Sequence, residues 1–300
     1  MTRNSRRTQV TESPASSPTP GTQQRVVPPE PQARPEAPNP FGLSFVVPTQ
    51  IVDLPSRGLL YGRDNPLRGS TSVEIKYMTA KEEDILVNED YMSRGILFDK
   101  LIDSLLVDKR ISSRDFLAGD KNAILIAARA TGYGAEYKMR LPCPQCGKVG
   151  VFCYDLNKVS SNMPSPQELE EQGIEYDSHD NVFRFELPNS KIRVGITLLT
   201  GHDHEYLKKQ EEQKEKLNLE TNTTIDFLRK VIVEANDVTD PGQLNQLAEV
   251  LPAIDSRKVR TVYANMMPEA DTKQLVACEH CSEESESEVP FTLEFFWPDV

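Results

Sequence analysis

Four of the five cysteines in this 300-residue chain stand in two Cys-x-x-Cys pairs. Cys143 and Cys146 lie in "RLPCPQCGKVGVFC", and Cys278 and Cys281 lie in "VACEHCSEE". A tight turn between two cysteines directs both sulfurs inward, and zinc favours four tetrahedral ligands, so each pair is half of a zinc site. We therefore expect these four cysteines to hold one zinc ion. Since four thiolates leave no open position for water, the expected zinc is structural rather than catalytic.

Three other uses of the cysteine pairs stay open at this stage. A thioredoxin-like redox pair would lie beside a helix N-terminus, whereas both pairs are expected between strands. Disulfides are typical of secreted chains, and the basic start "MTRNSRRTQV" is not followed by the apolar segment of a secretory signal. An iron–sulfur cluster would take four cysteines, but their spacing is not characteristic of one.

Three neighbouring features could also involve a metal. His280, inside the second pair, could replace a cysteine as ligand, although Cys281 is the better candidate. Cys153, on the strand expected after the first pair, is interpreted as a buried apolar residue. The histidines of "GHDH" (201–204) could suggest a second metal site, but a charged helix N-terminus is the simpler interpretation.

The sequence carries none of the common catalytic motifs. It has no phosphate-binding loop, no dinucleotide fingerprint and no nucleophile elbow. The acidic pairs Glu82-Glu83 and Glu211-Glu212 are expected on solvated helix faces. We expect no catalytic residue, and a binding or structural protein rather than an enzyme.

The elements that would position the cysteines are both helical and extended, which predicts an α+β fold. An alternating strand over 71–79 ends at Thr79, which forms a capping box with Glu82 and predicts a helix over 80–88. Apolar periodicity predicts helices over 96–109, 112–134, 223–236, 240–251 and 255–267, and the charge pattern predicts a mostly solvated helix over 201–220. A hairpin is expected over 181–200, and a polar loop over 160–181. Each cysteine pair is expected between two strands, with an acidic loop after the second pair.

The two halves of the chain share one order of elements: strand, helices, strand, cysteine knuckle, strand. Asp120 and Asp255 are offset by the same interval as Cys143 and Cys278, so residues 120–146 overlay 255–281 without a gap. We therefore predict two pseudo-repeated lobes joined at a shared four-cysteine zinc ribbon. The predicted boundaries are an N-terminal arm over 1–48, lobes over 49–160 and 182–300, and a polar spacer over 161–181.

The N-terminal arm has a composition unlike the rest of the chain. Its residues 1–40 contain nine of the 22 prolines, at positions 14, 18, 20, 28, 29, 31, 35, 38 and 40. Such a segment buries too little apolar surface to offset its ordering entropy, so we expect a flexible, extended arm that orders on a neighbouring subunit. The apolar stretch over 41–48, "FGLSFVVP", is expected to dock on the lobes or on a neighbour.

The net charge of −12 disfavours nucleic acid and anionic membranes as partners. A zinc-ribbon nucleic-acid binder is further disfavoured by "SEESESE" after the second pair, because it would repel phosphates. No run reaches 18 apolar residues, so no transmembrane helix is expected. We therefore expect protein partners. We also expect the chain to be made and to fold in a reducing cytoplasm.

Three segments resemble a known family. "DLPSRGLLY" (53–61), "RATGYGAEYKMRLPCPQCG" (129–147) and "FTLEFFWP" (291–298) are similar to signatures of the baseplate hub and hub-assembly proteins of T-even-type contractile-tailed bacteriophages. The resemblance covers roughly residues 50–300 and leaves the arm out. It implies a non-enzymatic structural adaptor in the virion tail baseplate, with hub, wedge and tail-tube proteins as partners and the host cytoplasm as the place of assembly. The alternative is a hub assembly factor or chaperone that is absent from the mature virion.

Overall fold

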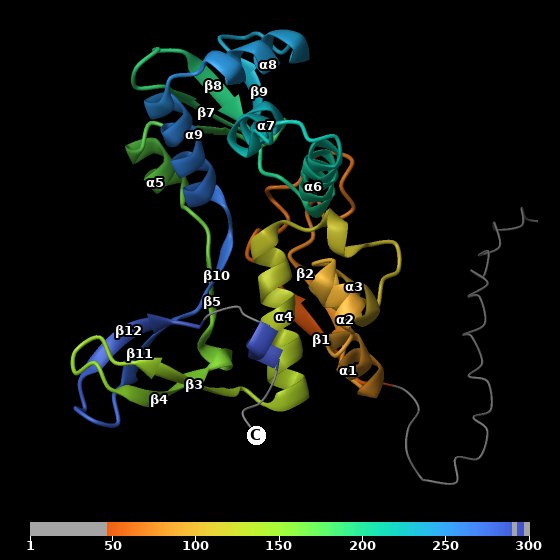
Figure 1. The fold of residues 1–300 in the computed structure, drawn as a ribbon, viewed down its shortest axis with the longest axis vertical. Coiled ribbons are helices and arrows are strands. Elements are labelled where there is room, and N and C mark those ends of the chain that lie inside the picture. The colour runs from red at the N-terminus through yellow and green to blue at the C-terminus, as the bar shows by residue number, and fades with distance from the viewer. Residues whose placement is uncertain (1–46, 290–292, 297–300) are drawn as a thin grey trace, which may run out of the picture. The chain divides into compact units, whose positions relative to one another are not determined.

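The computed structural model describes residues 47–289 and 293–296. The expected N-terminal arm therefore lies almost entirely outside the described residues. Within them, helices and strands are mixed, as an α+β fold requires, and the strands form one four-stranded sheet and four two-stranded sheets (Figure 1).

The first part of the fold is a hairpin followed by helices. β1 (Thr49–Asp53) pairs antiparallel with β2 (Ser72–Lys76), and α1 (Ala80–Leu86), α2 (Glu89–Ser93) and α3 (Leu97–Leu105) follow. The predicted capping box starts α1: the Thr79 N–H donates to Glu82 Oε2 at 3.0 Å. α3 buries the apolar face that its periodicity predicts, with Leu97, Leu101, Ile102 and Leu105 in the core.

A buried carboxylate fixes the long β1–β2 loop to α4 (Ala118–Tyr133), which follows the short helix η1 (Ser113–Asp115). Asp120, in the first turn of α4, accepts hydrogen bonds from the Ser56 N–H at 2.9 Å and from the Ser56 and Tyr61 hydroxyls at 2.5 Å each. The loop also contains Gly58 at φ +69°, where a Cβ would lie 2.4 Å from the Ser70 nitrogen. Backbone turns and one buried acid thus order a loop that has no regular structure of its own.

The cysteine pairs lie at the tips of two hairpins that pack side by side (Figure 1). β3 (Glu136–Pro142) pairs with β4 (Val149–Asp155), and β11 (Lys273–Ala277) pairs with β12 (Glu284–Glu288). Gln274 joins the hairpins by accepting from the Asp155 N–H at 2.9 Å and donating to the Asp155 carbonyl at 2.8 Å. We call these two hairpins the ribbon. The chain enters the first hairpin from α4 and leaves it through η2 (Leu156–Lys158) and β5 (Ser160–Asn162). It enters the second hairpin from β10 (Glu269–Asp271), which pairs with β5.

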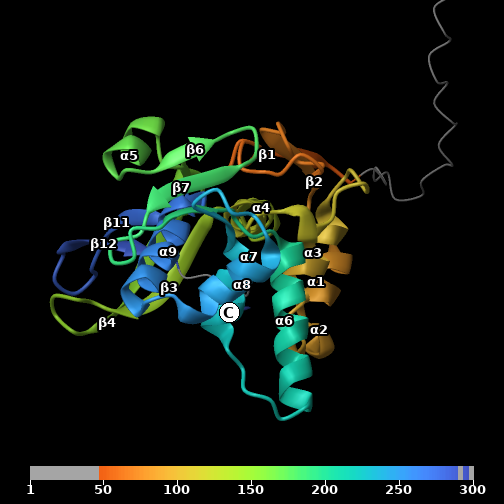
Figure 2. The ribbon, with the colours of Figure 1, turned by 90° about the horizontal axis from the view of Figure 1, so that it is seen from above.

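The remaining elements surround the four-stranded sheet, of order β6-β7-β8-β9. Its strands are β6 (Glu175–Asp177), β7 (Val182–Glu186), β8 (Arg193–Ile196) and β9 (Ile232–Ala235), and its helices are α5 (Pro166–Glu171), α6 (Gly201–Lys216), α7 (Thr223–Val231), α8 (Pro241–Val250) and α9 (Ala253–Met266). Figure 2 shows these helices and strands from above, with α6 and β7 labelled together with α3 of the first part of the fold. The Arg184 guanidinium pairs with Asp177 and with Glu234, each at 2.9 Å, and so ties β7 to its neighbour β6 and, across β8, to β9.

Four sequence predictions differ from the structure. Residues 160–181 are not a loop, because Ser165 caps α5 and buried Leu169 and Ile174 anchor α5 and β6. The helix predicted over 223–236 ends at Val231, since the β-branched residues that follow pair with β8 as β9.

The other two differences follow the second knuckle. The expected acidic loop is the strand β12, because its serines face inward and its glutamates face solvent. The final strand expected over "FTLEFF" is the 3-10 helix η3 (Leu293–Phe296) where the structure describes it. Phe295 and Phe296 of η3 are buried, and Arg129 Nε donates to the Phe295 carbonyl at 3.0 Å.

Candidate metal centre

The structure brings all four paired cysteines to one point, although the two pairs are far apart in sequence. The sulfurs of Cys143, Cys146, Cys278 and Cys281 all lie within 4.8 Å of one another. Two distances cross between the hairpins: Cys143 Sγ to Cys281 Sγ is 3.8 Å, and Cys146 Sγ to Cys278 Sγ is 3.9 Å. Cys143 and Cys278 are buried, whereas Cys146 and Cys281 are exposed.

These distances suit a tetrahedral metal. Four sulfurs at ~2.3 Å from a central zinc stand about 3.8 Å from each other. A disulfide needs about 2.05 Å, so all five cysteines are free thiols. The donor set is thus four sulfurs at the separations that a zinc ion of this coordination requires.

Both knuckles have the same backbone. The Cys143 N–H donates to the Lys148 carbonyl at 2.9 Å, and the Gly147 N–H donates back to the Cys143 carbonyl at 2.9 Å. In the second knuckle, Cys278 and Glu283 make the corresponding bond at 3.0 Å, and the Ser282 N–H donates to the Cys278 carbonyl at 2.8 Å. Gly147 and Ser282 both adopt positive φ, at +69° and +57°. This turn at the tip of each hairpin allows both cysteine sulfurs of the pair to face the same point.

Backbone N–H groups favour the thiolate at the buried cysteine of each knuckle. The N–H groups of Cys146 and Gln145 lower the pKa of Cys143 to about 7. The N–H groups of His280 and Cys281 likewise lower the pKa of Cys278, and the His280 nitrogen lies 3.4 Å from Cys278 Sγ.

The fourth sulfur behaves differently. The Glu283 N–H acts to lower the pKa of Cys281, but burial and the three neighbouring thiols outweigh it and raise that pKa to about 12. Four thiolates this close repel one another unless a cation lies between them. The donor set therefore fits a divalent metal better than it fits four free thiols.

The neighbouring candidates do not join this cluster. The His280 Nε2 lies 3.0 Å from the Val149 carbonyl, so the ring bonds the backbone of the opposite hairpin. Cys153 is exposed on β4, paired in register with Lys138, which contradicts the expectation that it is buried. The reason is the alternation of the strand, which turns Phe152 and Tyr154 inward instead.

The "GHDH" stretch forms the start of α6. Asp203 completes a capping box with Thr200 and pairs with Lys230 at 2.9 Å, while His202 Nε2 lies 3.0 Å from Asp115 Oδ1. Within residues 47–289 and 293–296, the cysteines are the single group of three or more candidate ligands close enough to hold a metal. The interpretation of "GHDH" as a charged helix N-terminus agrees with these contacts.

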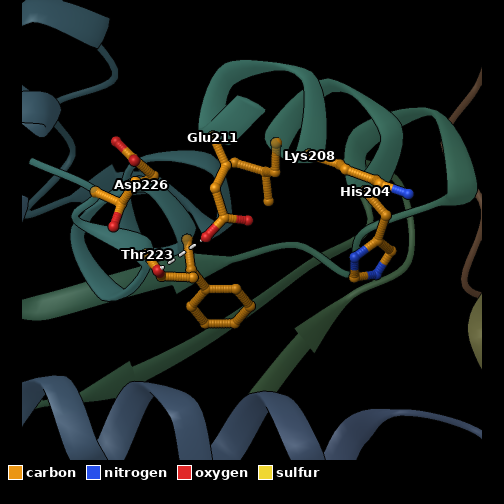
Figure 3. A pocket seen from close by; sticks show the side chains of 8 residues that line it. His204, Lys208, Glu211, Thr223 and Asp226 are labelled. Carbon is orange, nitrogen blue, oxygen red and sulfur yellow. Dashed lines mark hydrogen bonds between the residues drawn. The ribbon is translucent and has the colours of Figure 1, made fainter. Parts of the chain in front are cut away.

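A pocket of about 270 Å³ lies between α6 and α7 (Figure 3). Its acids have partners: Glu211 accepts from the Thr223 hydroxyl at 3.4 Å, and Asp226 pairs with Lys214 and Arg229. His204 lies along the same wall, on α6.

Sequence reasoning missed the residues that join the two hairpins. Gln274 bonds both backbone groups of Asp155, the Tyr154 hydroxyl lies 2.8 Å from Ser287 Oγ, and Glu279 accepts from the Val151 N–H at 3.3 Å. None of these residues belongs to a motif, so the cysteines gave the only signal that these hairpins meet.

Comparison with known families assigns most of the chain. Residues 52–297 match the family described as "T4 bacteriophage base plate protein". The chain belongs to this family. No curated protein and no solved structure matches the chain.

Membership indicates a structural baseplate role, a location in the virion tail and contact with other baseplate proteins. In the described part of the chain, no helix is both long enough and apolar enough to cross a membrane. The family and the sulfur cluster thus agree with a structural protein that could bind a metal.

Proposed function

We propose that this baseplate protein is a non-enzymatic adaptor that links hub and wedge components of a contractile tail, and that it folds around one structural zinc ion. Cys143, Cys146, Cys278 and Cys281 are the proposed ligands. Zinc is preferred among metals because it takes four thiolates tetrahedrally and has no redox chemistry. The observation that carries the proposal is the convergence of four sulfurs from two hairpins that are far apart in the sequence and both lie within the family match.

The zinc would fasten together parts of the chain that share few other bonds. Two-stranded hairpins are marginally stable alone, and zinc binding in small modules contributes roughly 10–16 kcal/mol to folding. A connector that transmits force through a tail benefits from such a link, because the two hairpins cannot then separate without losing the metal.

We also propose that the fold consists of two pseudo-repeated lobes, 49–160 and 182–300, with 161–181 extending the second lobe through β6. Asp120 and Asp255 support this proposal, because each lies in the first turn of a helix and accepts hydrogen bonds from a loop between paired strands, three at Asp120 and two at Asp255. Asp255 holds the β7–β8 turn through the N–H groups of Asn189 and Ser190, at 2.8 and 2.9 Å. Each helix then leads to a hairpin with a cysteine knuckle.

For the N-terminal arm, over 1–48, we propose a tethering role on a neighbouring subunit. Its proline content supports this role, since forty residues in the polyproline II conformation reach on the order of 120 Å at ~3.1 Å each. A tethered second contact raises the effective concentration of the first.

Two measurements test the proposal. Elemental analysis of the reduced, purified chain should find about one zinc per chain, and a metal-free, folded chain would contradict the zinc assignment. Mass spectrometry of purified virions, with cross-linking, should find the protein attached to hub and wedge proteins. Its absence from virions, together with its binding to hub proteins during assembly in the host cytoplasm, would replace the adaptor role with that of an assembly factor.

A further inference from the structure

A second cavity, of about 290 Å³, lies where the first two turns of α6 meet α3, η1 and the start of α4. Five basic and three acidic side chains line it, an excess of two positive charges in a chain whose net charge is −12. The cavity is thus a positive region on an acidic protein, where anions are attracted.

The acids of this cavity already have partners. Asp99 pairs with Lys121 at 2.6 Å, Glu205 pairs with Arg114 at 3.0 Å, and Asp103 accepts from the Ser113 N–H at 2.7 Å. Lys208 donates to the carbonyl of Arg94 at 2.6 Å and makes no ion pair in the part of the chain described here. Lys208 therefore keeps a positive charge that no carboxylate of the cavity neutralises.

Ser113 supplies a donor without an acceptor. The residue lines the cavity, is 1% exposed, and its Oγ has no hydrogen-bond partner among the residues that the structure describes. Buried hydroxyl groups are nearly always satisfied by protein, water or ligand. This hydroxyl can therefore donate to an acceptor that enters the cavity.

Two lysine ammonium groups at this cavity lie against the backbone of glycines. At Gly201, the first residue of α6, a Cβ would lie 2.9 Å from Lys121 Nζ and 2.7 Å from the Arg114 Cα. At Gly95, a Cβ would lie 3.3 Å from Lys208 Nζ. Burial, and then the charge of Lys121, lower the pKa of His204, which lines the same cavity. Two ammonium groups, a buried hydroxyl and a helix N-terminus thus meet at one cavity.

We propose that this cavity binds a compact oxyanion, with Lys208 as its charge partner and Ser113 as a hydrogen-bond donor. The oxyanion has two possible sources: the carboxylate of an acidic side chain on a neighbouring protein, or a free phosphate-type ion. Both offer oxygens that accept from an ammonium and a hydroxyl.

The test measures the melting temperature of the full-length chain in rising inorganic phosphate, or in rising N-acetylglutamate, with chloride keeping the ionic strength constant. Phosphate should stabilise the wild type in a saturable way. Lys208→Gln and Ser113→Ala should each weaken the apparent affinity about tenfold, since each removes a charge-assisted bond. Lys216→Gln, which removes the same charge from the exposed end of α6, should leave the affinity unchanged.

Ser113→Ala carries a second readout that a merely structural serine would not give. Without added anion it should melt at or above the wild-type temperature, because it removes an unpaired buried hydroxyl. Stabilisation by N-acetylglutamate as well as phosphate would support a protein carboxylate as the source, and stabilisation by phosphate alone would support a free ion. No saturable response to either anion, or equal responses in the Lys208→Gln and Lys216→Gln chains, would overturn the proposal.

Discussion

The individual cysteines of this protein have different surroundings, and their substitutions should differ accordingly. Cys143 and Cys278 are buried and receive backbone hydrogen bonds, whereas Cys153 is exposed on β4 and lies outside the cluster. The effect of replacing a cysteine should therefore depend on its position in the fold.

Cys143→Ser and Cys278→Ser should each abolish stoichiometric zinc and yield insoluble or misfolded protein, because a hydroxyl is a poor zinc ligand at a site of thiolates. Cys153→Ser is the matched control and should keep about one zinc per chain, as measured by elemental analysis of the soluble fraction. Equal zinc loss in all three variants would show that the assignment of ligands is wrong.

Gly58 lies in the "DLPSRGLLY" segment and has a backbone that an alanine cannot adopt without strain. Gly58→Ala should destabilise the protein by at least about 2 kcal/mol, since positive φ and a 2.4 Å approach to the Ser70 nitrogen both oppose a Cβ. Gly62→Ala, in the same loop, has open space around its Cβ and should change the free energy of unfolding by less than about 0.5 kcal/mol. Urea unfolding compares the two, and a neutral Gly58→Ala would contradict this account of the loop.

At the scale of elements, α4 and α9 each have a buried aspartate in the first turn, Asp120 and Asp255, that binds a loop. The surroundings of the two carboxyl groups differ. Burial raises the pKa of Asp120 above its usual 3.8, and the hydroxyls of Ser56 and Tyr61 offset this only in part. Burial also acts to raise the pKa of Asp255, but the N–H groups of Asn189 and Ser190 outweigh it and hold that pKa below 3.8. The two carboxylates should therefore respond to pH in opposite directions.

The folded protein binds the Asp120 proton more tightly than the unfolded chain does. The stabilising contribution of Asp120 is thus largest below pH 3.8 and falls as pH rises through its raised pKa. For Asp255 the contribution is present above pH 3.8 and is lost as pH falls through its lowered pKa. Urea unfolding between about pH 3 and 7 compares the free energy of unfolding of each variant with that of the wild type. The loss caused by Asp120→Asn should become smaller as pH rises. The loss caused by Asp255→Asn should become smaller as pH falls. Parallel pH profiles for the two variants would contradict these environments.

Some elements could be predicted from the sequence because their signals are local. Thr79 with Glu82 and Thr200 with Asp203 form capping boxes, and both α1 and α6 begin where these pairs indicate. The strand–knuckle–strand units around the cysteines also follow from residues close together in sequence.

Other elements depend on contacts that are distant in sequence. The alternating Glu and Ser residues of β12 are typical of a solvated loop, and they form a strand because β11 supplies its hydrogen bonds. β9 continues a helical pattern and leaves it because β8 offers an edge. The convergence of the four cysteines could be predicted, whereas the bonds of Gln274 that align the two hairpins could not, since no pattern marks that residue.

At the scale of the whole molecule, the ribbon has less support than the β6–β9 sheet, apart from the proposed metal. Its two hairpins are separate two-stranded sheets, joined by the side chains of Gln274, Tyr154 and Glu279. The β6–β9 sheet is larger and is covered by helices whose apolar faces are buried.

A chelator that removes the metal under reducing conditions should therefore loosen the ribbon before the sheet. Amide hydrogen exchange should lose protection over 136–155 and 273–288, while strands β7 and β8 keep theirs. Readdition of zinc should restore the protection, and equal protection with and without the metal would show that the ribbon does not depend on it.

The most direct test of the zinc-centred fold is X-ray absorption at the zinc edge on the purified, full-length chain. We predict four sulfur neighbours at ~2.3 Å, with no nitrogen or oxygen in the shell, because Cys143, Cys146, Cys278 and Cys281 form the one candidate ligand group in the described part of the chain. A shell of mixed nitrogen or oxygen and sulfur, or two sulfurs per zinc, would contradict the claim that the two hairpins share one ion.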